Sequence, residues 1–262
     1  MGNERSSEQV GAAQEAILIP VTAEDFERQR RRRLMKWLAV ALVALLVAAI
    51  IYKRVTDPRN AREAFDVGVR LIKTTHYDQA ILNFNRAVDL QPDFAEAYRM
   101  RGRAYVAQTN PAMALRDFSR VAALQPGDAS ILVERGFVHL DQRDYPAAIA
   151  DADRAVTLDP KLARAYNLRA SACRAAGDAR RALEDFTKAL KLEPNLDNYF
   201  QRAATYQLLG EHKLALADFN EAVAEDPQEA HIYYARAQSR AALGDSAGAQ
   251  ADILAGRKID GF

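Results

Sequence analysis

YDQAILNFNRAVDLQP, residues 77–92, decides the fold of this chain because its pattern returns along the sequence at a nearly constant interval. The proline that closes it is the first of five, spaced 34, 34, 34 and 33 residues apart: Pro92, Pro126, Pro160, Pro194 and Pro227. Twelve positions before each proline stands an alanine: Ala80, Ala114, Ala148, Ala182 and Ala215. Proline ends a helix, and small residues at fixed helical positions let two helices pack closely. The pattern therefore predicts a tandem array of paired helices.

Three more positions keep this register. The position eight residues before each proline is mostly aromatic: Phe84, Phe118, Ala152, Phe186 and Phe219. The position five residues before it is small or β-branched: Ala87, Val121, Ala155, Ala189 and Ala222. The position 24 residues before it is always glycine or alanine: Gly68, Gly102, Gly136, Ala170 and Ala203. A unit of about 34 residues with this pattern resembles the tetratricopeptide repeat, which is a helix-turn-helix. The resemblance implies an all-α fold in which stacked units form a right-handed superhelix, an α-solenoid.

Six units fit the resemblance: 61–94, 95–128, 129–162, 163–195, 196–229 and 230–262. The sixth keeps the small residues Ala237 and Ala249 but has Gly261 where the proline would fall. Arrays of this kind usually end in a polar helix that covers the last unit. Either the second helix of the sixth unit serves as this cap, which its polar residues favour, or a partner covers the end.

A second periodicity joins the two helices of one unit. The seventh position of units two to six holds Arg101, Arg135, Arg169, Arg202 and Arg236, and the twenty-third holds Asp117, Asp151, Asp185, Asp218 and Asp252. The first unit lacks both, with Val67 and Asn83 in their places. Because arginine and aspartate are missing together, we expect each arginine to pair with the aspartate of its own unit.

An apolar run precedes the repeats. No charged residue lies between Trp37 and Tyr52, and extension back to Leu34 gives 19 residues, since Lys36 can reach the interface. A helix of that length spans about 28 Å, close to the hydrocarbon thickness of a bilayer. The run is apolar on every face and predicts a transmembrane helix. Thr22 and Asp25 are typical of a helix start, so we expect the helix to run from about residue 23 to about residue 54.

A cleaved secretory leader is the alternative to an anchor. A leader has small neutral residues after its apolar region, whereas this run ends with bulky and then charged residues, 50–54. These features favour an uncleaved signal anchor. The orientation follows from the flanks, where six Lys or Arg residues lie within residues 28–36 and four follow the run (Lys53, Arg54, Arg59 and Arg62). The positive-inside rule places the N-terminus in the cytoplasm and the repeats on the far side, periplasmic in a bacterium.

The expected domain organisation has four parts. Residues 1–33 form a polar, partly disordered tail, and residues 34–54 form the anchor helix. Asp57 and Pro58 should end this helix, so residues 55–60 form a short linker. Residues 61–262 form the repeat domain.

The sequence argues against enzyme activity and against nucleic-acid binding. The chain has 36 basic and 35 acidic residues, whereas nucleic-acid-binding proteins usually carry a basic excess. Its four histidines and single Cys173 have no metal-ligand spacing, and no phosphate loop, nucleophile elbow or dinucleotide fingerprint is present. We therefore expect no enzyme activity, no catalytic residue, no metal and no cofactor.

The resemblance implies that the first helix of each unit lines a groove that binds a peptide or a partner helix. The inward positions hold polar and aromatic residues: Arg99, Arg103, Phe137, Arg164, Asn167, Arg174, Phe200, Gln201, Tyr234 and Gln238. Family members that grip acidic chaperone tails use a Lys/Asn clamp, but Phe65 and Val69 stand at its first two positions. A chaperone adaptor is therefore disfavoured.

The predicted function is that of a membrane-anchored scaffold for protein–protein interaction, which would aid assembly of membrane or envelope complexes. The alternative is a permanent accessory subunit of a larger membrane complex. Ala41, Ala44 and Ala48 lie on one face of the expected span and would allow close contact with another span.

Overall fold

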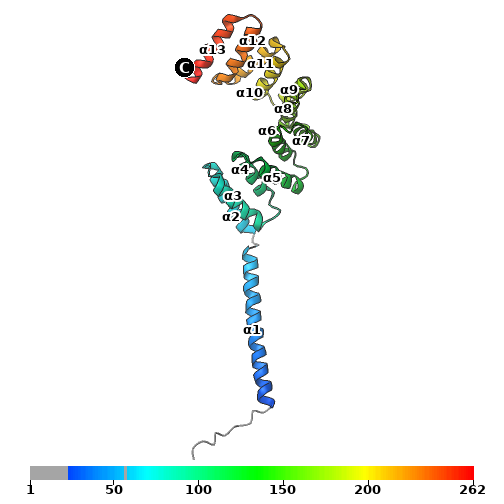
Figure 1. Cartoon of the computed structure of the whole chain (residues 1–262), viewed down its shortest axis with the longest axis vertical. Helices are drawn as coiled ribbons and strands as arrows, with labels where there is room; N and C mark the ends of the chain where they lie inside the picture. Colours follow the sequence, from blue (N-terminus) through cyan, green and yellow to red (C-terminus); the bar gives the residue numbers. More distant parts are fainter. Residues whose placement is uncertain (1–22, 56–57) are drawn as a thin grey trace, which may run out of the picture. The chain divides into compact units, whose positions relative to one another are not determined.

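The computed structural model describes residues 23–55 and 58–262. The first 22 residues of the expected tail lie outside this range. The chain divides into two compact units at residues 56 and 57. Within the described residues, the first unit contains one helix, α1, and the second contains twelve, α2 to α13, with no strand (Figure 1).

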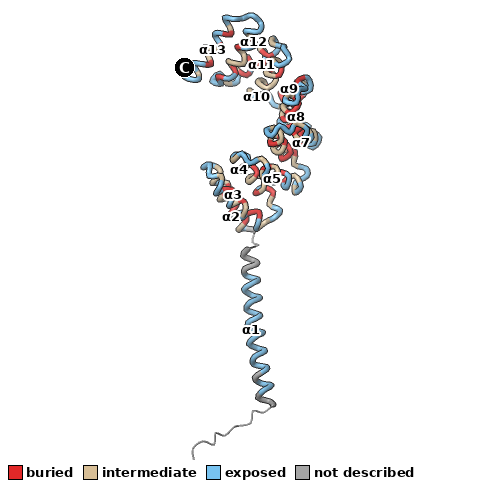
Figure 2. Tube along the Cα trace, in the orientation of Figure 1, coloured by how far each residue is buried: buried red, intermediate tan, exposed pale blue. Residues whose placement is uncertain are grey.

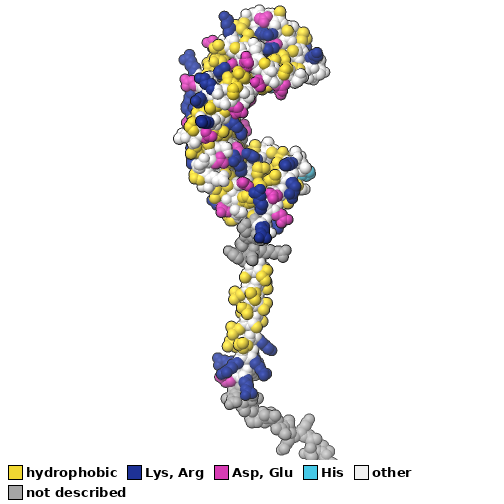
Figure 3. Space-filling view, turned by 180° about the vertical axis from the view of Figure 1, so that it is seen from behind, with side chains coloured by type: hydrophobic (Ala, Val, Ile, Leu, Met, Phe, Trp, Pro, Cys, Tyr) yellow, Lys and Arg dark blue, Asp and Glu magenta, His cyan; other side chains and the backbone are white. Residues whose placement is uncertain are grey.

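Helix α1, Ala23–Val55, agrees with the helix expected from about residue 23 to about residue 54. Its segment Phe26–Ile50 is long and apolar enough to cross a membrane, and its apolar part is not buried within the structure. Apolar side chains surround this segment, and Lys and Arg side chains gather at its N-terminal end (Figure 3). A signal sequence has the same properties, so length and composition leave both interpretations open.

The second unit consists of six consecutive helix pairs. Their bounds are Pro58–Lys73 (α2) with Tyr77–Leu90 (α3), Ala95–Ala107 (α4) with Pro111–Leu124 (α5), Ala129–Asp141 (α6) with Tyr145–Leu158 (α7), Ala163–Ala175 (α8) with Ala179–Leu192 (α9), Leu196–Leu208 (α10) with His212–Glu225 (α11), and Ala230–Ala242 (α12) with Ser246–Asp260 (α13). Helix α2 includes the last part of the expected linker, because proline is well accepted in the first turn of a helix, where its missing N–H is not needed.

The core of each pair lies where its two helices cross, and buried segments occur along the helices of every pair (Figure 2). The phenylalanines eight residues before the prolines are almost completely buried, and so are the alanines twelve before them. A Cβ atom on Gly102 would lie 2.5 Å from the ring of Phe118, and one on Gly68 would lie 2.6 Å from the ring of Phe84. Glycine at these positions therefore lets the two helices approach closely around the aromatic ring.

The turn inside each pair contains one residue with left-handed backbone. It is the fifteenth residue of every unit, with positive φ at Thr75, Thr109, Arg143, Gly177, Gly210 and Gly244. The second helix of units one to five ends two residues before the repeat proline, as expected for a helix that proline stops. Helix α13 ends differently, because Gly261 has φ 82° and its N–H donates to the carbonyls of Arg257 and Lys258.

The five arginine–aspartate pairs are confirmed. In each unit from two to six, the arginine of the first helix donates two hydrogen bonds to both carboxylate oxygens of the aspartate in the second helix. All five aspartates are buried. In four of the five units the remaining nitrogen of the guanidinium bonds a residue of the preceding unit: Asn85, Ser119, Asp153 or Asn220. The arginines therefore join both helices of one unit and also join neighbouring units.

Candidate protein-binding groove

The first helices form the inner side of the stack. Contacts join α2 with α4, α6 with α8, and α10 with α12, whereas no comparable contact joins the second helices of neighbouring pairs in the described repeats. The predicted groove residues all belong to first helices, so they lie on the helices that form this inner side. We refer to the inner surface of α4, α6, α8, α10 and α12 as the groove.

Arg99 and Arg103 of α4 meet at one carboxylate of the next unit. Arg103 Nε lies 2.8 Å from Glu134 Oε2, and Arg99 Nε lies 2.8 Å from Glu134 Oε1. Arg99 also donates to Asp128 and Ser130. Burial alone would raise the pKa of Glu134, but the hydrogen bonds from Arg103 and Arg99 hold it below its ordinary value. Both arginines thus stabilise the α4–α6 contact, and Arg103, half exposed, keeps one face toward the groove.

Beside this cluster the groove contains a cavity of about 400 Å³. Its apolar lining comes from Val106, Phe118, Phe137 and Val138, and its charged lining from Arg103, Glu134, Asp141 and Arg164. The guanidinium carbon of Arg164 lies 5.9 Å from the centroid of the Phe137 ring, and Arg164 has no ion-pair partner among the described residues. The cavity therefore combines an aromatic surface with an exposed cation, a combination that is common at protein-binding sites.

Arg174 and Asn167 lie further along the groove, between α8 and α10. Arg174 donates to the backbone oxygen and side chain of Gln201 and to the hydroxyl of Thr205, all neutral acceptors. Burial lowers the pKa of Arg174, and the negative charge of Asp197 only partly offsets this effect. Asn167 donates to Asn198, and its own buried side-chain oxygen has no hydrogen-bond partner among the residues that the structure describes.

The last predicted groove residues lie in units five and six. The rings of Phe200 and His231 form an edge contact with centroids 4.8 Å apart. Tyr234 donates to Asp260 at 2.7 Å, and this bond raises the pKa of the Tyr234 phenol. Tyr234 also packs on Gly256, so it covers α13 instead of pointing into the groove, while Gln238 remains exposed.

The structure thus brings Arg103, Phe137 and Arg164 together at one cavity. It places Arg99 and Tyr234 in contacts within the chain, which groove position alone did not reveal. Val106 and Asp128 were missed by sequence reasoning. Asp128 immediately precedes α6 and accepts from Ser130 N–H, so its capping position was a signal that could have found it. Among the described residues, no group of three or more His, Cys, Asp or Glu could hold a metal ion.

This geometry defines an all-α solenoid of stacked helix pairs with a polar and aromatic inner groove. Family models for the tetratricopeptide repeat match residues 65–129, 99–163, 163–196 and 196–229. The chain therefore belongs to the tetratricopeptide repeat family, whose members are scaffolds for protein–protein interaction. No curated protein matches the chain in sequence.

Solved structures share the fold at low identity. PilF of Pseudomonas aeruginosa is 18% identical, with a TM-score of 0.67 over 77% of this chain and 92% of that one. MamA of Desulfovibrio magneticus RS-1 is 18% identical, with a TM-score of 0.58 over 63% and 94%. YrrB, a tetratricopeptide repeat protein with an unusual peptide-binding site, is 18% identical, with a TM-score of 0.54 over 67% and 91%. At these identities the likeness shows the fold alone.

Proposed function

We propose that this protein is a membrane-anchored scaffold that holds partner proteins in the groove and aids the assembly of membrane or envelope complexes. The observation that supports this proposal best is the cavity beside Phe137. There an apolar surface adjoins Arg164, a cation without an ion-pair partner among the described residues. A partner segment that presents an apolar side chain next to an acidic one satisfies both, because the apolar group is removed from water and the carboxylate pairs with the guanidinium.

In this proposal α1 is the anchor and remains in the membrane. Its apolar segment is long enough to span a bilayer, whose hydrocarbon core removes such side chains from water. The basic residues at its N-terminal end support an orientation with the N-terminus in the cytoplasm and the repeats on the far side of the membrane, the periplasm in a bacterium.

The test is photo-crosslinking from inside the groove. A photoreactive amino acid replaces Val106, which lines the cavity and is 40% exposed. The control carries the same group at Leu82, on the second helix of unit one, which is 67% exposed. In membranes of the native host, position 106 should yield a defined crosslinked protein that position 82 does not. Loss of that product in an Arg164→Glu variant would support the groove as the binding site. An identical set of products from both positions would contradict it.

The alternative, a fixed accessory subunit, has one observation in its favour. Ala41, Ala44 and Ala48 lie on one face of α1 and offer a smooth surface to another membrane helix. A fixed subunit should purify from mild detergent in a constant ratio with its partner. A scaffold that binds and releases partners should purify alone, and its crosslink at position 106 should depend on partner concentration.

A further inference from the structure

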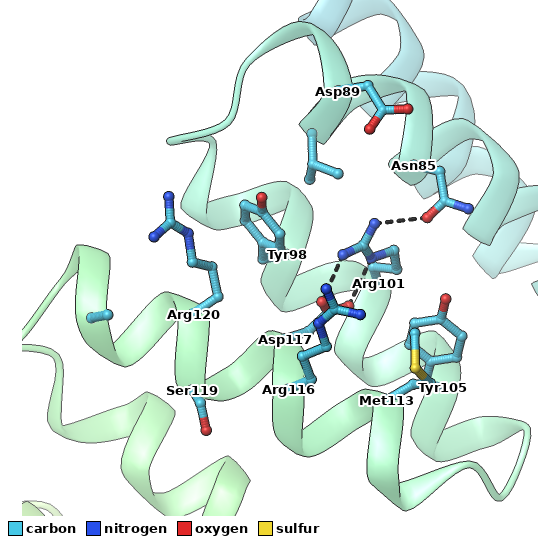
Figure 4. A pocket seen from close by; sticks show the side chains of 12 residues that line it. Asn85, Asp89, Tyr98, Arg101, Tyr105, Met113, Arg116, Asp117, Ser119 and Arg120 are labelled. Atoms are coloured by element: carbon cyan, nitrogen blue, oxygen red, sulfur yellow. Dashed lines mark hydrogen bonds and ion pairs between the residues drawn. The ribbon is translucent and has the colours of Figure 1, made fainter.

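A second cavity lies on the outer side of the repeats, between α3 and α5 and over α4. It has a volume of about 750 Å³, within the range of roughly 300–1,000 Å³ that is common for ligand pockets. Tyr98 and Tyr105 of α4 form its aromatic lining, while Arg116 and Arg120 of α5 lie beside them (Figure 4). The groove cavity contains Arg103 of the same helix, so the two cavities lie on opposite faces of α4. The groove proposal leaves this outer cavity unexplained.

The arginines of the outer cavity divide into a closed set and an open set. Arg101 belongs to the closed set, because it donates to Asp117 and to Asn85. In the open set, Arg116 has no ion-pair partner among the described residues. Within the described part of the chain, Arg120 donates only to the carbonyl of Pro92 at 3.1 Å, and its guanidinium lies 5.9 Å from the Tyr98 ring centroid. The open set thus offers two guanidinium groups for a partner.

The same-sign pair contributes nothing to the stability of the helix that carries it. Arg116 and Arg120 are four residues apart on the exposed side of α5, where like charges repel by about 0.2–0.5 kcal/mol. At the two corresponding positions the other second helices have Leu82 and Arg86, Ala150 and Arg154, Glu184 and Lys188, Ala217 and Glu221, and Ala251 and Ala255. Only α5 has two cations there, so the repeat pattern does not require them.

Asp89 decides which kind of anion fits. It lies across the cavity on α3, is exposed, and has no ion-pair partner among the described residues. A polyphosphate or a nucleic-acid backbone presents only negative charge and would be repelled by this carboxylate. A polypeptide segment carries both kinds of group: its acidic side chains can pair with the two arginines while a backbone N–H donates to Asp89. Its aromatic or apolar side chains can contact Tyr98 and Tyr105.

We propose that the outer cavity binds an acidic segment of a partner protein, in which carboxylates alternate with apolar or aromatic side chains. Arg116 and Arg120 hold the carboxylates, and Tyr98 and Tyr105 hold the apolar side chains. The protein then has two protein-binding surfaces on opposite faces of α4, and a partner on the outer side does not compete with one in the groove.

The test uses the full chain in nanodiscs of zwitterionic lipid and three arrays of fluorescent octapeptides. In these arrays Glu, Gln or Lys alternates with every apolar residue in turn, and fluorescence anisotropy measures the affinity. Members of the Glu array should bind best. The Arg116→Ala/Arg120→Ala variant should weaken their binding about tenfold or more, as expected for the loss of two charge-assisted hydrogen bonds.

A matched variant isolates the site. Arg154→Ala removes the corresponding cation of α7, which lies outside the cavity, and should leave the affinity within about twofold. All chains compared carry Arg164→Ala, so that binding of the same peptides beside the groove cation does not contribute. Circular dichroism should show equal helicity for all variants. Equal binding of the Gln and Glu arrays, or no binding of any Glu peptide, would overturn the proposal. So would tighter binding of inositol hexakisphosphate or of phosphatidylglycerol vesicles through Arg116 and Arg120.

Discussion

Arg101 and Asp117 face each other across the two helices of one unit, with Nε–Oδ2 and Nη2–Oδ1 distances of 2.7 Å. The carboxylate side chain of Asp117 is 1% exposed and the side chain of Arg101 is 13% exposed. Arg101 donates its remaining bond to Asn85 of the preceding unit, also at 2.7 Å. The pair is therefore a buried, bidentate connection at a junction of three helices.

This geometry predicts that removal of one partner destabilises more than removal of both. Arg101→Met leaves the Asp117 carboxylate buried without a cation and should lower the free energy of unfolding by about 3–5 kcal/mol. The double variant Arg101→Met/Asp117→Leu removes the stranded charge and should lose less. Urea unfolding of the full chain in detergent, followed by circular dichroism, measures the difference.

The control for this cycle is an exposed arginine. Arg62 lies 3.3 Å from Asp66 and 3.0 Å from Glu96, and all three side chains are about half exposed. Arg62→Met should therefore change the free energy of unfolding by less than about 1 kcal/mol. If Arg101→Met cost no more than Arg62→Met, the buried pair would have no special role in stability.

The turn inside each helix pair gives a second prediction. Thr75 has φ 60°, a left-handed conformation that is strained for a β-branched residue, whereas Gly177 has φ 96° at the same position of unit four. Thr75→Gly should raise the stability by about 0.5–1 kcal/mol, because relief of strain exceeds the entropy cost of glycine. Gly177→Thr should lower it by at least as much. Thermal unfolding measures both changes.

The neighbouring Thr74 provides the control, since it is not among the residues with positive φ. Thr74→Gly should leave the melting temperature unchanged or lower it, because glycine adds freedom to the unfolded chain without relief of strain. A rise in melting temperature for Thr74→Gly equal to that for Thr75→Gly would mean that backbone strain is not the cause.

The Glu134 carboxylate predicts how stability changes with pH. Its pKa lies below the ordinary 4.5 because Arg103 and Arg99 donate to it, so its ionised form is favoured in the folded state. Its contribution to stability is complete above about pH 4.5 and is lost as the pH falls through the lowered pKa of the folded state. Glu134→Gln should therefore be less stable than the unmodified chain at pH 7. The difference between the two should shrink below about pH 4.5. Thermal unfolding between pH 3 and pH 7 measures it, and a constant difference over this range would exclude the ionised carboxylate as the cause.

The fold could be predicted because its signal repeats. Spacing alone indicated the paired helices, and the joint absence of arginine and aspartate from the first unit indicated which residues pair. Contacts that occur only once were out of reach of this reasoning. The inward position of Arg99 suggested a free groove cation, but a long side chain can reach Glu134 of the next unit. Tyr234 likewise turns to Asp260. An acidic residue recurs at the position of Asp260, but a tyrosine stands at the fifth position of the sixth unit alone.

The same reasoning explains why the outer cavity was missed. Its tyrosines and Arg120 occupy repeat positions that also hold aromatic or basic residues in other units. The sequence alone therefore gave no reason to distinguish them from ordinary surface residues. Arg116 is the exception to the pattern, and its significance depends on the cavity beside it, which only the packing of three helices creates.

Retention of α1 can be separated from cleavage by an epitope tag before residue 1. The bulky and charged residues 50–54 after the apolar segment lack the small residues of a cleavage site. We therefore expect the tag to remain on the membrane-bound protein after expression in a bacterial host, with the full-length mass. A mature chain without the tag, released from membranes by washing, would identify the segment as a leader.

The charge flanks of α1 predict an orientation that can be inverted. Six basic residues precede the apolar run within residues 28–36, against four after it, so alkaline phosphatase fused after Phe262 should be active in a bacterial host and a fluorescent protein fused there should be dark. Replacement of residues 30–33, four arginines, with alanine leaves Arg28 and Lys36 against those four. The bias then points the other way, so phosphatase activity should fall and fluorescence should appear. Alanine at Arg116 and Arg120 removes charge from the repeats, outside the flanks of the span, and should change neither reporter, which controls for charge loss itself. If the unmodified chain gave a fluorescent fusion without phosphatase activity, the repeats would be cytoplasmic and partners in the periplasm would be excluded.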